Sequence, residues 1–205
     1  MPHWCNTSYT VMGDPKELDA LYILMKELEE RKEPLVKSDF HNTWLGNLVA
    51  ALGGDYEDIH CRGAWDSAER LEDRVCFNTE TAWSEMSDTF DFVRSKFPNL
   101  KFYFCAEEDG CQYYVTNDVE GVVYNWRYCF APHTDDDDDE YYYSENELEC
   151  FLSAVSKLVG HQVNTPKEAE EAVYEYNKNQ EKGSYAIIRI YDVRKDEPLN
   201  TQSDE

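Results

Sequence analysis

The sequence has few basic residues and no long apolar run. Lysine and arginine together number 19 among 205 residues, against 43 aspartates and glutamates, so the formal net charge is −24. Proteins that hold nucleic acid through its phosphates need clustered lysine and arginine, which argues against direct nucleic-acid binding. No stretch of about 18 apolar residues occurs, so no membrane-spanning helix is expected.

Export signals and paired cysteines are also missing. Residues 1–4 show no basic segment leading into an apolar one, as a secretory signal peptide would. The seven cysteines are odd in number and include no C-x-x-C pair. Reduced thiols and a cytoplasmic location are therefore expected, because disulfides form mainly in exported proteins.

Aromatic residues, in contrast, are plentiful: 15 Tyr, 9 Phe and 5 Trp. A disordered acidic chain would lack them, so a folded core is expected. The length suggests one elaborated domain, or one domain with a small appendage.

Periodicity and breaking residues predict the order of elements along residues 1–130. Strands are expected at residues 4–12, 59–68, 74–82, 100–106, 112–116 and 122–130, and helices at 15–32, 42–52 and 84–97. Asp14 followed by Pro15 is a helix start, and Ser84 is a further expected N-cap. Asp109-Gly110 predicts a tight turn between two strands.

This order predicts an α+β fold of the ferredoxin-like type, a split β-α-β antiparallel sheet with helices on one face. Extra strands and a C-terminal helical elaboration extend it. The expected division is a domain over 1–130 with an inserted helix, an acidic loop over 131–147, and helices and a strand over 148–194 packed on the same domain. Residues 195–205 are polar, and a frayed tail is expected there.

The C-terminal third begins with a change in composition. Residues 131–150 hold nine acids and no lysine or arginine. Ser144 with Glu147, and Thr165-Pro166 with Glu168, are capping-box patterns that predict two helices. A last strand is expected over 185–193.

Several short segments resemble the YubB-like family, ferredoxin-like proteins encoded on plasmids, phages and other mobile elements. The segments are Met1-Pro2-His3-Trp4-Cys5 with Asn6, Gly13, Cys61-Arg62-Gly63, Phe77-Asn78-Thr79-Glu80-Thr81-Ala82-Trp83-Ser84 and Lys96-Phe97-Pro98-Asn99-Leu100. The resemblance spans roughly residues 1–130. It implies a fold and a genomic setting, and it implies no activity.

The run of acids from Asp135 through Asp136, Asp137, Asp138 and Asp139 to Glu140 allows three interpretations. A solvated, self-repelling loop is one, and a docking surface for a basic protein partner is the second. A calcium loop starting at Asp136 is the third, but its sixth position is Tyr141 where glycine is required. A sharper form of docking is a DNA mimic, which needs dense acids on rigid elements.

Glu80 with His60 and Asp66 forms the candidate catalytic group, because neighbouring strands can bring such side chains together for acid–base chemistry. Trp65, Trp83 and Trp126 are candidate binding residues. No zinc site is expected, because Cys105 and Cys111 lack two further ligands at matching spacing. No cofactor-binding motif is present either.

The leading hypothesis is a non-enzymatic accessory or interaction protein of a mobile-element locus, with an unknown and possibly basic partner. The alternatives are an acidic DNA mimic of the anti-restriction type, and a small ligand-binding protein or hydrolase that uses the region of Glu80 and Trp83. The oligomeric state does not follow from the sequence.

Overall fold

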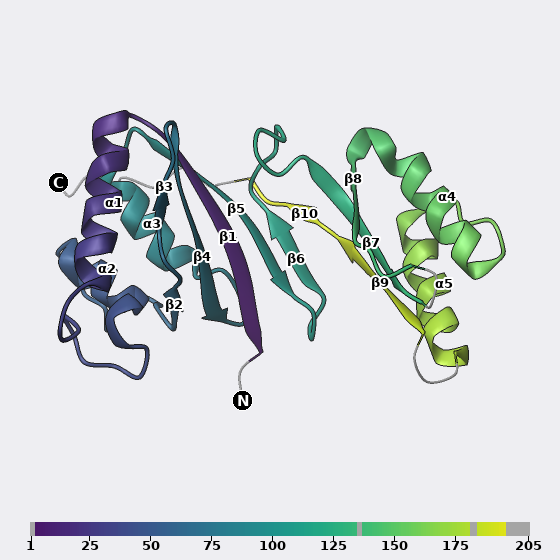
Figure 1. Ribbon diagram of the computed structural model, residues 1–205, viewed down its shortest axis with the longest axis horizontal. Coiled ribbons are helices and arrows are strands. Elements are labelled where there is room, and N and C mark those ends of the chain that lie inside the picture. The colour runs from purple at the N-terminus through teal and green to yellow at the C-terminus, as the bar shows by residue number, and fades with distance from the viewer. Residues whose placement is uncertain (1–2, 135–136, 181–183, 196–205) are drawn as a thin grey trace, which may run out of the picture. The chain divides into compact units, whose positions relative to one another are not determined.

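The computed structural model describes residues 3–134, 137–180 and 184–195, and within them the chain is α+β (Figure 1). The chain divides into two compact units, Met1–Asn117 with Arg194–Glu205, and Asp118–Val193. The division falls after Asn117, earlier than the expected boundary at residue 130. No helix in the described ranges has the length and apolar character to cross a bilayer.

An antiparallel sheet forms the framework of the first unit. Its strands follow the order β6-β5-β1-β4-β2, and β3 also pairs with β4. The strands are β1 (Trp4–Gly13), β2 (Gly63–Trp65), β3 (Glu69–Arg70), β4 (Arg74–Ala82), β5 (Leu100–Glu108) and β6 (Tyr113–Thr116). The central strand β1 is therefore bonded on both edges.

Helices α1 (Pro15–Glu29), α2 (Leu45–Ala51) and α3 (Ser87–Lys96) belong to the same unit, with a short 3-10 turn at His41–Thr43. The Asp14 carboxylate accepts hydrogen bonds from the amides of Lys16 and Glu17 at 3.0 and 3.1 Å, so the predicted cap of α1 is confirmed. The second helix is shorter than expected, because the chain forms the 3-10 turn before Leu45.

The expected cap at Ser84 is wrong. Helix α3 begins at Ser87, and its N-cap is Met86, whose backbone is left-handed at φ 57°. The Ser84 carbonyl instead accepts a hydrogen bond from the Thr81 hydroxyl at 2.5 Å. The chain first carries Glu85 into the interior, and only then does the helix start.

Alternation along β1 buries Cys5, Thr7, Tyr9 and Val11 on one side of the sheet. The apolar stripe of α1 packs in the same core, through Leu18, Leu21, Met25 and Leu28. Tyr9 stacks on Phe77 and Phe90, with ring centroids 5.0 and 4.1 Å away. Offset aromatic pairs of this kind stabilise a core beyond their buried area.

The second unit has its own sheet, in the order β8-β7-β9. Its core includes Tyr128, Phe130, Phe151 and Val155. The elements are β7 (Trp126–His133), β8 (Tyr141–Ser144), a 3-10 turn (Glu145–Glu147), α4 (Leu148–Val159), α5 (Pro166–Asn179), β9 (Tyr185–Ile190) and β10 (Asp192–Val193). Helices α4 and α5 and strand β9 thus share a core of their own.

The strand expected over 122–130 starts later, at Trp126. Asp118 is buried, and its carboxylate accepts hydrogen bonds from the amides of Val122, Val123 and Tyr124 at 2.9, 2.6 and 2.8 Å. These amides are therefore satisfied by a side chain rather than by a neighbouring strand. An alternating sequence pattern does not show that a side chain, rather than a neighbouring strand, bonds these amides.

The two capping-box predictions have different outcomes. Glu147 accepts from both the amide and the hydroxyl of Ser144 at 2.8 Å, so the first box is formed. Thr165 accepts from the Glu168 amide at 3.2 Å, but the Glu168 carboxylate accepts from the Asn164 amide at 2.8 Å. The second box is therefore displaced by one residue. Strand β8 lies within the segment that was expected to be a loop.

Candidate functional site

A cavity of about 290 Å³ lies in the first unit beside helix α3. Its wall combines aromatic rings with charged and polar groups. The lining residues are Tyr9, Glu85, Ser87, Phe90, Asp91, Arg94, Phe102, Phe104, Asn117, Arg194 and Lys195. The sheet, one helix and the returning C-terminal segment all contribute to this wall.

The apolar part of the wall follows from strand and helix periodicity. Phe102 and Phe104 are two residues apart on β5, so both point to the side that Tyr9 faces from β1. Ser87, Phe90 and Arg94 recur at helical spacing and share one side of α3. The Arg94 guanidinium is paired with Asp91 on the same helix.

Glu85 is the most buried charged group of the cavity wall, with 1% of its surface exposed. Its carboxylate accepts hydrogen bonds from the Ser87 and Tyr113 hydroxyls, each at 2.5 Å, and is paired with Arg194. The Tyr9 hydroxyl donates to the Glu85 backbone carbonyl at 2.9 Å. The residue is therefore bonded through both its side chain and its backbone.

Burial alone would raise the pKa of Glu85. The hydrogen bonds from Ser87 and Tyr113 and the charge of Arg194 outweigh burial, so the pKa lies below its ordinary value. The same carboxylate, together with burial, raises the pKa of Tyr113. At neutral pH the arrangement holds a carboxylate, a neutral phenol and a guanidinium together.

Arg194 reaches the cavity because the chain returns to the first unit after the second. The Arg194 amide donates to the Thr116 carbonyl at 2.9 Å, which fixes the backbone beside β6. Its guanidinium lies 5.5 Å from the centre of the Phe104 ring, at a distance typical of cation–π contact. Lys195 follows directly in the lining.

The structure gives no support for a thiol nucleophile among the buried cysteines. Burial raises the pKa of Cys5 to about 11, and burial also raises the pKa of Cys61. A nucleophilic cysteine needs its pKa lowered by a nearby cation or a helix N-terminus. Both thiols therefore behave as small apolar side chains of the core.

Two of the three candidate catalytic residues are brought together. Glu80 and Asp66 line an open hollow on the other face of the sheet, with Asn6, Ser8 and Asn78 beside them. His60 is exposed and pairs instead with Asp88, Nδ1 to Oδ2 at 2.7 Å. The expected His/Asp/Glu group is thus reduced to two carboxylates on a hydrated surface.

The three candidate tryptophans have different environments. Trp65 is 2% exposed, and its indole Nε1 donates to the Glu29 carboxylate at 3.0 Å, so it belongs to the core. Trp126 packs edge-on against Tyr124 and Tyr142. Trp83 is 53% exposed in a left-handed backbone conformation, and its ring stacks on His3. Only Trp83 offers a ring face to solvent at a strained position.

The acid run is described from Asp137 onward, since Asp135 and Asp136 lie outside the described residues. Asp138 contacts His133, with Oδ1 and Nδ1 2.5 Å apart, and Asp137 accepts from the Tyr141 hydroxyl at 3.0 Å. Asp139 is exposed. The Glu147 carboxylate, which a calcium loop would require, is bonded to Ser144 instead.

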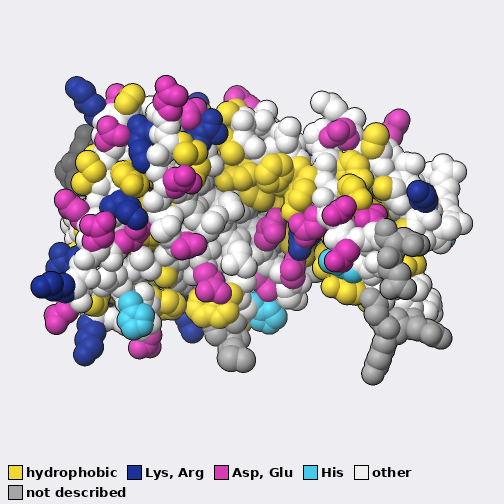
Figure 2. Space-filling model, in the orientation of Figure 1, with side chains coloured by type: hydrophobic (Ala, Val, Ile, Leu, Met, Phe, Trp, Pro, Cys, Tyr) yellow, Lys and Arg dark blue, Asp and Glu magenta, His cyan; other side chains and the backbone are white. Residues whose placement is uncertain are grey.

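Acidic side chains on the face shown in Figure 2 are scattered among neutral and hydrophobic groups rather than aligned in rows. A mimic of duplex DNA would need regularly spaced charge, about one per 1.7 Å of axis.

Sequence reasoning missed both Glu85 and Arg194. Glu85 stands in a segment of mixed polarity, and Arg194 falls between the strand expected over 185–193 and the tail expected over 195–205. The two are 109 residues apart, and no spacing rule links them. One local signal did exist: an acid in the first turn of the helix expected over 84–97, in a stretch with aromatic residues on both sides.

Comparison with known proteins gives no further guide to the site. No family model, no curated protein and no solved structure matches this chain.

Proposed function

We propose that the first unit binds a small anionic molecule with a flat apolar part, and that it acts by binding rather than by catalysis. One observation carries this proposal. The cavity brings three cationic side chains and two carboxylates together over an aromatic floor, whereas the whole chain has 19 bases against 43 acids. Ligand sites commonly combine a mostly apolar wall with a few convergent polar groups.

The volume limits the ligand. A cavity of about 290 Å³ is at the lower end of the range of roughly 300–1,000 Å³ seen for ligand pockets. Phe102 and Phe104 offer aromatic surface, and the Lys195 ammonium offers a charged donor to an anionic group. An aromatic carboxylate has a ring that packs against the aromatic part of this wall and a charged group that bonds to the cationic part.

The lowered pKa of Glu85 favours a binding role for the cavity over a catalytic one. A general acid or base works best with a pKa near the operating pH. The hydrogen-bond donors around Glu85 and the charge of Arg194 outweigh burial and lower its pKa, which moves it further from neutral pH. The carboxylate therefore serves to hold Tyr113 and Arg194 in place.

The test is calorimetric titration of the purified chain with benzoate and phenylacetate, and with the corresponding neutral amides. The carboxylates should bind and the amides should not. Lys195→Gln should weaken carboxylate binding by about tenfold, the loss expected for one charged hydrogen bond. Lys167→Gln, which removes a side chain 84% exposed on α5, is the matched control and should bind as the parent does. Equal binding of amides, or no effect of Lys195→Gln, would contradict the proposal.

The first unit supports a ferredoxin-like arrangement at the level of strand order. The succession β5-β1-β4-β2, with antiparallel pairing throughout, is the order that a split β-α-β sheet of this type requires. The accessory role on a mobile element and the DNA-mimic role stay predictions. The genes that flank this one test the first, and competition with duplex DNA for a restriction enzyme at low salt tests the second.

A further inference from the structure

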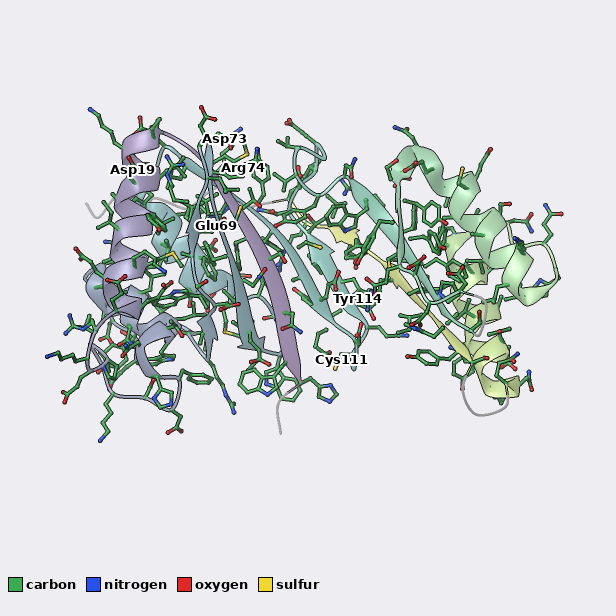
Figure 3. The ribbon with its side chains drawn as sticks, in the orientation of Figure 1. Asp19, Glu69, Asp73, Arg74, Cys111 and Tyr114 are labelled. Atoms are coloured by element: carbon green, nitrogen blue, oxygen red, sulfur yellow. The ribbon has the colours of Figure 1, made fainter. Side chains whose placement is uncertain are left out.

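A second group of chemically reactive side chains lies away from the cavity. His3, Glu108 and Cys111 place one imidazole nitrogen, one carboxylate oxygen and one sulfur within 4.8 Å of one another. Cys111 lies in the turn that joins β5 to β6, and Figure 3 labels it there with Tyr114 on β6. Three elements of the chain thus meet in one donor set: the start of β1, the end of β5 and the hairpin turn.

Glu108 is fixed at this point by hydrogen bonds from the backbone. Its side chain is 5% exposed, and it accepts hydrogen bonds from the amides of Gly110 and Cys111 at 2.8 and 2.7 Å. A carboxylate has about four lone-pair sites, so acceptor capacity remains on its outer side.

His3 is positioned by three separate contacts. Its Nδ1 lies 3.1 Å from Oε1 of Glu108, its ring stacks on Trp83 with centroids 5.6 Å apart, and its carbonyl accepts from the Trp83 amide at 2.9 Å. The His3 side chain is 48% exposed, so an ion can reach it from solvent. These contacts also account for the exposed, left-handed Trp83, which supports the imidazole.

Gly110 leaves room for the imidazole. A Cβ added at this residue would lie 2.1 Å from Nδ1 of His3 and 2.7 Å from Oε1 of Glu108. An alanine at residue 110 would therefore push the ring or the carboxylate out of its present position. Tyr114 further supports the turn through a hydrogen bond from its hydroxyl to Asp109 at 2.9 Å.

We propose that His3, Glu108 and Cys111 form a site for a divalent transition-metal ion of the zinc type, with a fourth position open to water. Nitrogen, oxygen and sulfur donors together suit zinc, whereas magnesium and calcium take oxygen ligands. Tetrahedral bonds of about 2.0–2.3 Å need ligand atoms roughly 3.3–3.8 Å apart. Side-chain rotations that move the ligand atoms by about an ångström therefore bring them to these distances.

Binding is accompanied by loss of a proton. A thiol binds a metal ion as a thiolate, so Cys111 must give up its proton when the ion arrives. The metal–sulfur bond forms as the S–H bond breaks, and the proton goes to solvent or buffer. No change in oxidation state is involved.

Cobalt(II) is the appropriate probe, because a thiolate bound to cobalt gives a charge-transfer absorption band. The full chain, treated with a chelator and then titrated, should bind one equivalent and show this band, also in excess magnesium. Cys111→Ser should abolish the band. Cys150→Ser removes another exposed cysteine, on α4, and should leave the band unchanged. A band that survives Cys111→Ser, or that is lost equally with Cys150→Ser, overturns the proposal.

Gly110→Ala keeps all three donors and tests their placement. It should lower cobalt affinity by at least about tenfold, the lower end of the loss seen when groups that orient a ligand are removed. Circular dichroism of the variant shows whether the chain is folded. Unchanged affinity in a folded Gly110→Ala protein would exclude His3 as a ligand. Zinc titration in two buffers of different ionisation enthalpy measures the released proton, and its absence would exclude Cys111 as a thiolate ligand.

Discussion

Glu85 of the first unit and the acid run of the second unit place carboxylates in opposite surroundings. In the first unit, Glu85 is almost fully buried and is bonded to Ser87, Tyr113 and Arg194. In the second, Asp138 and Asp139 of the acid run are exposed to solvent. The net charge of −24 counts these groups equally. The comparison teaches that the energetic weight of an acid is set by its burial and its donors.

The second unit itself contains both an acid paired with a buried arginine and an acid exposed to solvent. Glu140, the last acid of the run, pairs with Arg189, Oε1 to guanidinium nitrogen at 3.0 Å, and Arg189 is buried. The pair lowers the pKa of Glu140, chiefly through the Arg189 hydrogen bond. One residue earlier, Asp139 is exposed. Four predictions test the difference between buried and exposed acids, from the largest expected effect to the smallest.

Glu85→Ala should lower the free energy of unfolding by about 3–5 kcal/mol, because the donors around a buried charge lose their acceptor. Urea unfolding followed by circular dichroism measures this loss. Glu80→Ala is the matched control, since Glu80 is an exposed acid on β4, and its effect should stay within about 0.5 kcal/mol. Equal losses for the two variants would remove the distinction between them.

Glu85 should also make stability depend on pH in acid. Because its folded pKa is lowered, its stabilising effect is present above the ordinary carboxyl pKa of 4.5 and is lost as pH falls through the folded value. Unfolding free energies measured at intervals below about pH 5 should fall more steeply for the parent chain than for Glu85→Gln. Parallel curves would show that the pKa is not lowered in the folded state.

Glu140→Ala should cost about 1–3 kcal/mol, because the buried Arg189 guanidinium loses its carboxylate partner. Asp139→Ala, one position earlier, is its control, and a change within about 0.5 kcal/mol is expected there. Thermal unfolding of both variants in the same buffer compares them directly. A larger effect for Asp139→Ala would reverse the assignment of the two acids.

Replacing Asp137, Asp138 and Asp139 together by asparagine should change the unfolding free energy least, by no more than about 0.5 kcal/mol. Any increase in the unfolding free energy from reduced charge repulsion should appear at low salt and vanish near physiological ionic strength, because salt screens exposed charges. Melting temperatures at two salt concentrations measure this. Loss of folding in the triple variant would show that the run has a structural role.

Much of the fold could be predicted because its signals are local. Strand β4 spans Arg74–Ala82, as alternation predicted, and Asp109-Gly110 lies in the turn of residues 109–112 between β5 and β6. Asp14 caps α1 and Ser144 pairs with Glu147, since a capping side chain bonds amides only two or three residues away. Each of these features depends on neighbours in sequence.

Two of the wrong predictions concern places where a buried carboxylate lies close to the end of an expected element. Met86 replaces Ser84 at the start of α3, next to the buried Glu85. Asp118 holds the amides of residues 122–124, so β7 begins at Trp126. In both places a buried carboxylate imposes bonds that short-range patterns do not include.

The contacts that form the candidate sites could not be predicted from local sequence patterns. The sequence by itself determined the acidic charge, the aromatic core residues, the capped helices and the hairpin turn, because these depend on composition and on neighbours. Only the tertiary structure decided that Arg194 meets Glu85 across 109 residues and that His3 meets Glu108 across 105. Such contacts arise when strands and returning segments pack together, and their partners are chosen by geometry in space rather than by spacing along the chain.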